Sequence, residues 1–149
     1  MIKISFKFLI LLSLISAHIV ADDFKTKTKF KAQYPKSAYA KRISGYAIVE
    51  FVINEKGRTE QNSVITSKCF NLIDKNGVYF WYDFEKKKIS AANDCKYFDF
   101  KALKASKHLV YENYLGKPIE HSYKYNFKHW SLIKVDSVID LETGDFVLK

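Results

Sequence analysis

The stretch that decides the fold is YPKSAYAKRISGYAIVEFVINEKGRTEQNSVITS, residues 34–67. It predicts a short helix, a strand, a tight turn and a second strand, in that order. Pro35 suits the first helical position because its ring fixes φ near the helical value. Gly45 suits the residue just after a helix, where a positive φ is often needed. The stretch therefore predicts a compact unit that mixes helix and sheet.

The first predicted strand covers residues 46–54, where the side chains alternate between two faces. An alternation of period two is typical of a strand with one buried face. Residues 55–58 form the turn, in which Gly57 is free to take a positive φ. Residues 63–67 return to extended structure. One face of the first strand carries Ala47, Val49, Phe51 and Ile53, and the other carries Tyr46, Ile48, Glu50, Val52 and Asn54.

This pattern resembles the C-terminal domain of TonB-family proteins. The resemblance is carried by Tyr34, Pro35, Ala38, Gly45, Val49, Phe51, Ile53, Gly57, Val64 and Ser67. Residues 98–105 are similar to the second helix of the family, and residues 116–119 resemble the approach to its last strand. The matched blocks span most of residues 34–130. The resemblance implies an α+β fold with a three-stranded antiparallel sheet and two helices on one face.

The length of 149 residues suits one small domain behind a leader. We expect a signal peptide at residues 1–21 and a basic linker at 22–33. The TonB C-terminal-like domain would then cover residues 34–130, with an insertion at 68–97. Residues 131–149 are a C-terminal extension whose sequence predicts a terminal hairpin, 135–141 with 145–148.

The leader has the features of a secretory signal. Lys3 and Lys7 flank an apolar run, residues 8–15, that is too short to cross a bilayer as an ordinary helix. Cleavage after Ala21 is preferred over cleavage after Ala17. The sequence thus predicts a periplasmic chain with no stable membrane span after cleavage, and an uncleaved anchor is the alternative.

The chain is basic, with a formal net charge of +9. Its lysines are scattered and no recognition helix or zinc finger is present in the sequence, so we do not expect nucleic acid as a partner. Residues 24–31, FKTKTKFK, alternate lysine with threonine or phenylalanine. They are interpreted either as a basic arm for an acidic surface or as a solvated linker or edge strand kept soluble by lysine.

The insertion carries an aromatic run, residues 77–84, with strand propensity. It is expected to form a hairpin against Ile89 or to extend the sheet. It is either a binding surface or a satellite core beneath a long loop. Cys69 and Cys95 bracket the insertion and are the only cysteines. In an exported chain this pair predicts a structural disulfide, and two free buried thiols are the alternative.

Two further elements follow the insertion. Residues 99–113 predict the main helix, with Ala102, Ala105 and Leu109 at helical spacing. Residues 117–130 predict the last strand, and their alternation indicates that one side is buried. One face of this strand carries Ile119, His121, Tyr123, Tyr125, Phe127 and His129, and the other carries Glu120, Ser122, Lys124, Asn126 and Lys128.

No pattern of residues indicates catalysis. His121 and His129 would lie about 26 Å apart on a regular strand, too far to share a metal. The carboxylates of the insertion are dispersed, and no glycine-rich phosphate loop is present in the sequence. We therefore predict a non-enzyme without metal or cofactor, although an enzyme with no recognisable motif is a third interpretation of the whole chain.

The resemblance implies a function in protein interaction. In the resembled family this domain pairs a strand with a short peptide of an outer-membrane transporter and takes part in energy-coupled transport. The expected partner-binding residues are Ile119, His121, Tyr123, Tyr125 and Phe127. The terminal hairpin or a second copy of the chain, as a homodimer, would compete for that edge. The alternative is a structural or envelope-polymer-binding protein with a basic surface and no transport role.

Overall fold

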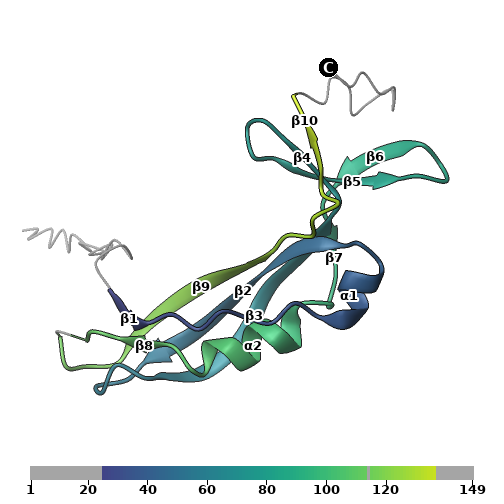
Figure 1. Cartoon of the computed structure of the whole chain (residues 1–149). Helices are drawn as coiled ribbons and strands as arrows, with labels where there is room; N and C mark the ends of the chain where they lie inside the picture. The colour runs from purple at the N-terminus through teal and green to yellow at the C-terminus, as the bar shows by residue number, and fades with distance from the viewer. Residues whose placement is uncertain (1–24, 114, 137–149) are drawn as a thin grey trace, which may run out of the picture.

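The computed structural model describes residues 25–113 and 115–136, and these form two four-stranded sheets, one two-stranded sheet and two helices. Figure 1 shows a long main sheet with helices below it and a smaller sheet that rises from one end. The predicted α+β class is therefore confirmed. The elements are β1 (Thr26–Thr28), α1 (Lys36–Ala40), β2 (Ser44–Ile53), β3 (Thr59–Phe70), β4 (Leu72–Asp74), β5 (Tyr79–Asp83), β6 (Lys88–Ala91), β7 (Asn93–Asp94), α2 (Asp99–Ser106), β8 (Val110–Tyr111), β9 (Ile119–Phe127) and β10 (Ile133–Val135).

The main sheet has the order β7-β3-β2-β9, and each neighbouring pair is antiparallel. Its three long strands are the predicted ones, and β7 is a short addition next to one end of β3. The alternation predicted for β2 is confirmed, because Ala47, Val49, Phe51 and Ile53 are all at most 1% exposed. The turn between β2 and β3 also forms as predicted, with Gly57 at φ 76°.

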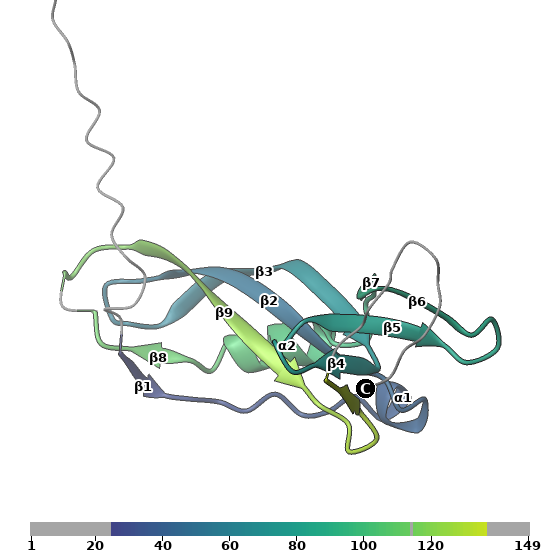
Figure 2. The same cartoon turned by 90° about the horizontal axis from the view of Figure 1, so that it is seen from above.

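Both helices cover the same face of the main sheet (Figures 1 and 2). Helix α2 packs on β2 and β3, and Ala38 of α1 lies in the same buried cluster as Phe98 and Ala102. The segment between β1 and α1 reaches the end of β9 at Tyr34, whose ring centroid is 6.0 Å from that of Phe127. Its residues Ala32 and Tyr34 pack against the core. Within residues 24–31, for which the sequence left an edge strand open, residues 26–28 form strand β1 and pair with β8.

The start and end of α1 differ from the prediction. Pro35 is the N-cap, with an extended ψ of 130°, and the helix begins at Lys36. The residue with positive φ after the helix is Arg42, at 57°. Gly45 instead lies inside β2, where an added Cβ would be 2.0 Å from the Phe98 ring. The glycine is needed because Phe98 packs against the strand, a requirement set by a residue 53 positions away in the chain.

The predicted helix over residues 99–113 is too long, because α2 ends at Ser106. The Ser106 hydroxyl donates to the Leu103 carbonyl and accepts from the Asn62 side chain. A tight turn follows, and residues 110–111 pair with β1 as β8. Leu109 is still buried as predicted. The helix is cut short because the chain pairs with a distant strand, which helical periodicity cannot reveal.

The insertion builds most of the second sheet, whose order is β10-β4-β5-β6. The predicted hairpin forms between β5 and β6, with Tyr82 opposite Ile89. Strand β10 adds in parallel to β4. The C-terminal extension thus joins this sheet through residues 133–135, and the remainder of the predicted hairpin lies outside the described residues. The predicted signal peptide also lies outside them.

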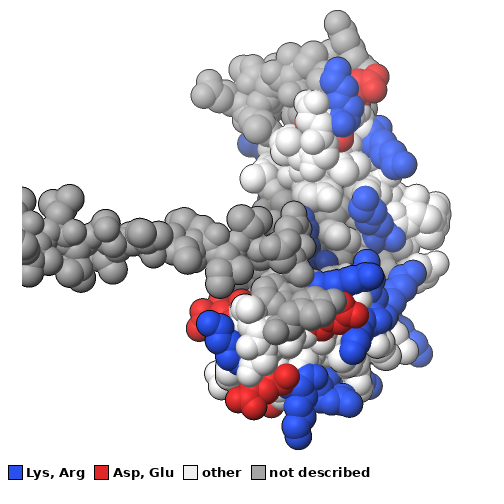
Figure 3. Space-filling model, turned by 90° about the vertical axis from the view of Figure 1, so that its left-hand side faces the viewer, with Lys and Arg blue, Asp and Glu red and all other residues white. Residues whose placement is uncertain are grey.

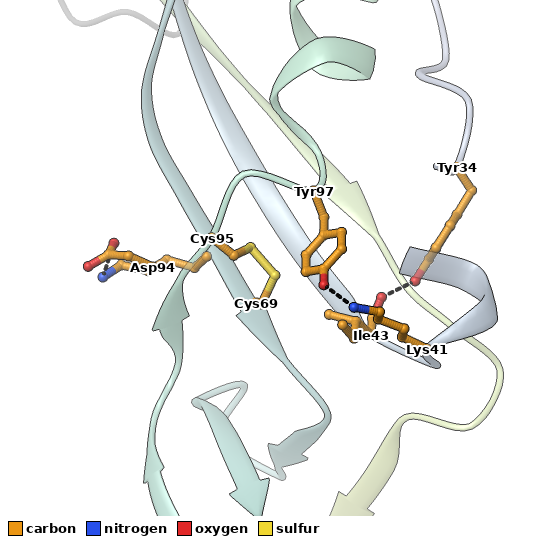
Figure 4. Close-up of a disulfide and its surroundings, with 8 residues drawn as sticks. Tyr34, Lys41, Ile43, Cys69, Asp94, Cys95 and Tyr97 are labelled. Atoms are coloured by element: carbon orange, nitrogen blue, oxygen red, sulfur yellow. Dashed lines mark hydrogen bonds and ion pairs between the residues drawn. A yellow bond between two sulfur atoms is a disulfide. The ribbon is translucent and has the colours of Figure 1, made fainter. Parts of the chain in front are cut away.

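A disulfide joins Cys69, near the end of β3, to Cys95, just after β7 (Figure 4). The two Cα atoms are 5.8 Å apart, and Cys69 is 3% exposed. Beside it, the Lys68 ammonium lies 2.8 Å from the Asp94 carboxylate. A covalent bond and an ion pair therefore hold the end of the insertion, at Asp94 and Cys95, against strand β3 of the main sheet.

Candidate interaction edge

The outer edge of β9 is the long free edge of the main sheet. Strand β9 pairs with β2 from Gly45↔Phe127 to Ile53↔Ile119 without a register shift. On its other side, no strand of the described residues pairs with it. In an antiparallel strand, alternate residues point N–H and C=O groups away from the existing neighbour. The edge of β9 therefore presents a regular row of backbone donors and acceptors.

The predicted partner-binding side chains all face the core side of the sheet. Tyr125 and Phe127 are only 4% and 3% exposed, so these two residues can offer a partner their backbone alone. Ile119, His121 and Tyr123 are half-buried. Sequence reasoning did not single out the opposite face, although the same alternation identifies it. That exposed face carries Glu120, Ser122, Lys124 and Asn126.

Lys124 gives the exposed face a fixed feature near the second sheet. Its ammonium lies 3.9 Å from the centroid of the Tyr46 ring and 5.5 Å from that of Tyr79. A cation over aromatic rings is held by the ring quadrupole. The contact directs the Lys124 ammonium over Tyr46 of β2 and Tyr79 of β5, so the positive charge lies inward from the outer edge of β9.

Tyr34 closes the core side of β9 at the end nearest α1. Its ring meets the rings of Phe98 and Phe127 edge-on, with each pair of centroids 6.0 Å apart. Its hydroxyl donates to the Ile43 carbonyl (Figure 4). Burial raises the pKa of Tyr34 to about 12, so the hydroxyl keeps its proton at neutral pH. Tyr34 therefore joins the segment after β1 to the sheet.

Buried polar groups lie farther along the same face. The hydroxyls of Tyr111 and Tyr125 are buried and have no hydrogen-bond partner within the described part of the chain. Burial raises the pKa of both tyrosines. Burial also lowers the pKa of His121, whose ring centroid is 5.3 Å from that of Tyr111. These shifts all favour neutral side chains under β9.

The remaining histidines do not build a metal site. His129 is buried, and its Nδ1 contacts the Ser131 hydroxyl at 2.7 Å. The ring centroid of His108 lies 4.8 Å from that of Phe30. Over residues 25–113 and 115–136, no group of three His, Cys, Asp or Glu side chains is arranged to hold a metal. Within the same residues no helix has the length and apolarity needed to cross a membrane.

The opposite edge of the main sheet is less suited to strand addition. Strand β7 pairs with β3 only at Lys68 and Cys69. The β2–β3 register shifts twice, and Gln61 in β3 takes a positive φ of 55°. Bulges of this kind twist an edge away from regular pairing. Of the two edges, β9 is the one whose backbone can accept a further strand.

Three comparisons with known proteins bear on this arrangement. Residues 31–80 match the family model for the Gram-negative bacterial TonB protein C-terminal. No curated protein matches the chain. The solution NMR structure of the Pseudomonas aeruginosa TonB C-terminal domain is similar in structure, with a TM-score of 0.48 and 17% sequence identity. That likeness covers 75% of this chain and 92% of the other. The family match confirms the resemblance seen in the sequence over the residues that it covers.

Proposed function

We propose that this TonB C-terminal-like chain is an envelope interaction module that binds an extended segment of a partner protein along β9. The partner would be an outer-membrane transporter or another envelope protein. The observation that carries the proposal is the uninterrupted pairing of β9 with β2 beside a free outer edge. Backbone pairing would supply affinity, and contacts to alternate side chains would supply selectivity.

Two further features support the choice of β9. Strand β10, which follows it, turns away and pairs with β4, so the described part of the C-terminal extension does not cover this edge. No proline lies between Ile119 and Phe127, so every residue of the strand has a backbone N–H. Lys124 and Asn126 on the exposed face would lie beside the side chains of an added strand.

Amide hydrogen exchange tests the pairing directly. The probe is a synthetic peptide from the extended N-terminal segment of an outer-membrane transporter of the same organism. In the free protein, alternate amides of β9 should exchange fast, because they point away from β2. On binding, those amides should become protected, while the amides bonded to β2 should stay protected throughout.

The control peptide has the same sequence with alternate backbone nitrogens methylated on the pairing side. It keeps the side chains but loses the donors, so it should not protect β9. Protection that is absent with the unmodified peptide, or that appears instead along β3, would contradict the proposal. Protection that grows with protein concentration alone would show a second copy of the chain on the edge and would also count against a transporter peptide.

The proposed role includes no catalysis, in keeping with TonB C-terminal domains as interaction domains without enzymatic activity. It also includes export to the periplasm, with cleavage after Ala21 and the division into leader, domain and extension given above. The disulfide supports export, because such bonds persist in oxidising compartments. Intact-mass measurement of the protein from a periplasmic extract should give a chain that starts at Asp22.

A second candidate function rests on the distribution of charge. Figure 3 shows Lys and Arg side chains along the right-hand side of the molecule over most of its height. The lysines of residues 25–31 are all exposed. A surface with this many exposed cations could bind an anionic polymer of the cell envelope through electrostatic attraction alone. That binding would weaken steeply with added salt, whereas strand pairing through the backbone would weaken little.

A further inference from the structure

An open cleft of about 640 Å³ lies at the junction of the two four-stranded sheets, and no residue of β9 lines it. The turn between α1 and β2 forms one wall with Lys41 and Arg42. Strand β5 and the turn after it form another with Trp81, Asp83 and Glu85. The cleft has the volume of a typical ligand site. It exists because the insertion folds as a second sheet at the end of the first (Figure 1).

Two large aromatic side chains at this cleft are exposed to solvent. Phe84 lines it and is 64% exposed, and Trp130 is 75% exposed. Trp130 lies at the rim, because the next residue, Ser131, lines the cleft, and the Arg42 guanidinium is 5.9 Å from its ring centroid. Large aromatic side chains that are exposed next to a cleft are candidates for contact with a ligand.

Residues at the rim of the cleft contact neighbouring side chains. The ring centroid of His129 is 5.1 Å from that of Trp130, and His129 is buried and bonded to Ser131. Arg42 has a positive φ of 57°, a conformation that costs a non-glycine residue free energy. The Lys41 ammonium donates to the Tyr97 hydroxyl at 2.8 Å (Figure 4). Lys41 and Trp130 thus each have a neighbour, Tyr97 and His129 respectively, that favours one position of the side chain.

The charges of the cleft cancel. Lys41 and Arg42 are cations, and Asp83 and Glu85 are carboxylates. Oδ1 of Asp83 accepts the backbone N–H groups of Glu85 and Lys86, both at 3.0 Å. These hydrogen bonds, that of Lys86 above all, lower the pKa of Asp83, so it stays ionised at neutral pH. An anionic ligand would be repelled by one wall and a cationic ligand by the other.

A hydroxyl group meets neither penalty, because it donates to a carboxylate and accepts from a cation. A sugar ring combines several hydroxyls with an apolar face of C–H groups that can lie flat on an indole. We infer that this cleft binds a neutral carbohydrate chain, with a sugar ring stacked on Trp130 and its hydroxyls bonded to Arg42, Asp83 and Glu85. This site is separate from the β9 edge and does not depend on strand pairing there.

An NMR titration with neutral oligosaccharides tests the inference. The probes are chitohexaose, cellohexaose and maltohexaose, each added to the full chain up to about 10 mM, which detects binding in the millimolar range. At least one should shift the indole N–H signals of Trp130 and Trp81 and the guanidinium signal of Arg42. Trp130→Ala should weaken that binding about tenfold or more, as the loss of an aromatic anchor usually does.

The matched control is Phe100→Ala, which removes another aromatic ring, 70% exposed on α2, away from the cleft. It should leave the affinity unchanged. Because Trp130 and Phe100 are both exposed, both variants should keep the amide spectrum of the folded protein. The inference is wrong if none of the three sugars shifts the cleft signals, or if Trp130→Ala binds as well as the native chain. It is also wrong if a hexaglutamate or hexalysine peptide displaces the sugar, since either result would show a site selected by charge.

Discussion

The two four-stranded sheets of this protein are stabilised in different ways. The main sheet rests on a continuous core in which Phe51, Phe98 and Leu109 are at most 1% exposed. The strands of the second sheet have few buried apolar side chains, namely Leu72 and Phe80 among the described residues. Its structure is stabilised instead by contacts between residues close in the sequence. These are the stacking of Phe70 on Tyr79, with ring centroids 4.1 Å apart, and the hydrogen bonds between Asn71 and Tyr82. The comparison indicates that the main sheet can hold its structure alone and that the second sheet cannot.

The largest effect is expected for Phe51→Ala. Truncating this buried ring leaves a cavity in the core beneath β2, which should cost about 3–5 kcal/mol of unfolding free energy. Urea denaturation followed by far-UV circular dichroism measures the loss. In a Trp130→Phe background, the fluorescence of Trp81 in β5 reports the second sheet. Both signals should change at the same lowered urea concentration. If the second sheet unfolded at a higher urea concentration than the main sheet, the second sheet would be the more stable of the two.

A slightly smaller effect is expected for the double variant Cys69→Ala/Cys95→Ala. The disulfide closes a separation of 26 residues, and its loss should cost roughly 3–4 kcal/mol through the unfolded chain. Hydrogen exchange should show the loss first in β5 and β6, because the bond ties the insertion to the main sheet. Equal losses of protection in β2 and β5 would mean that the bond serves the whole domain.

Asn71→Ala should destabilise the second sheet without affecting the stability of the main sheet. The Asn71 side chain donates to the Tyr82 carbonyl at 2.8 Å and accepts the Tyr82 N–H at 2.7 Å. The alanine variant loses both hydrogen bonds to the half-buried backbone of Tyr82, which should lower the free energy of unfolding of the second sheet by about 1–3 kcal/mol. We expect faster amide exchange in β5 and β6, with β2 and β9 unchanged. Ser90→Ala on the exposed strand β6 is the control and should change neither sheet.

The smallest effect concerns pH and the main sheet alone. Burial lowers the folded-state pKa of His121, so the unfolded chain binds its proton more readily. Stability from this group is present above the unfolded pKa of about 6.5 and is lost as the pH falls through the folded pKa. Thermal melts between pH 7.5 and pH 5 should show a smaller decrease for His121→Gln than for the native chain. An identical decrease would exclude a contribution from His121.

The sequence predicted those parts of the fold that follow from neighbouring residues. The period-two pattern identified the two faces of β2, and Gly57 identified the turn after it. The positions of Ala102, Ala105 and Leu109 identified the face of α2 that meets the sheet. Alternation also assigned the faces of β9, although only burial showed that Tyr125 and Phe127 offer a partner backbone alone. Local patterns succeed here because side-chain direction depends on backbone geometry within a few residues.

Tertiary structure decided what depends on residues far apart in the chain. Gly45 is required by the ring of Phe98, and α2 ends at Ser106 because residues 110–111 pair with β1. The parallel addition of β10 to β4 leaves the outer edge of β9 without a strand in the described chain, and the same second sheet forms the cleft beside Arg42. Hydrophobic periodicity records which face of an element is buried and carries no information about which distant strand becomes its neighbour.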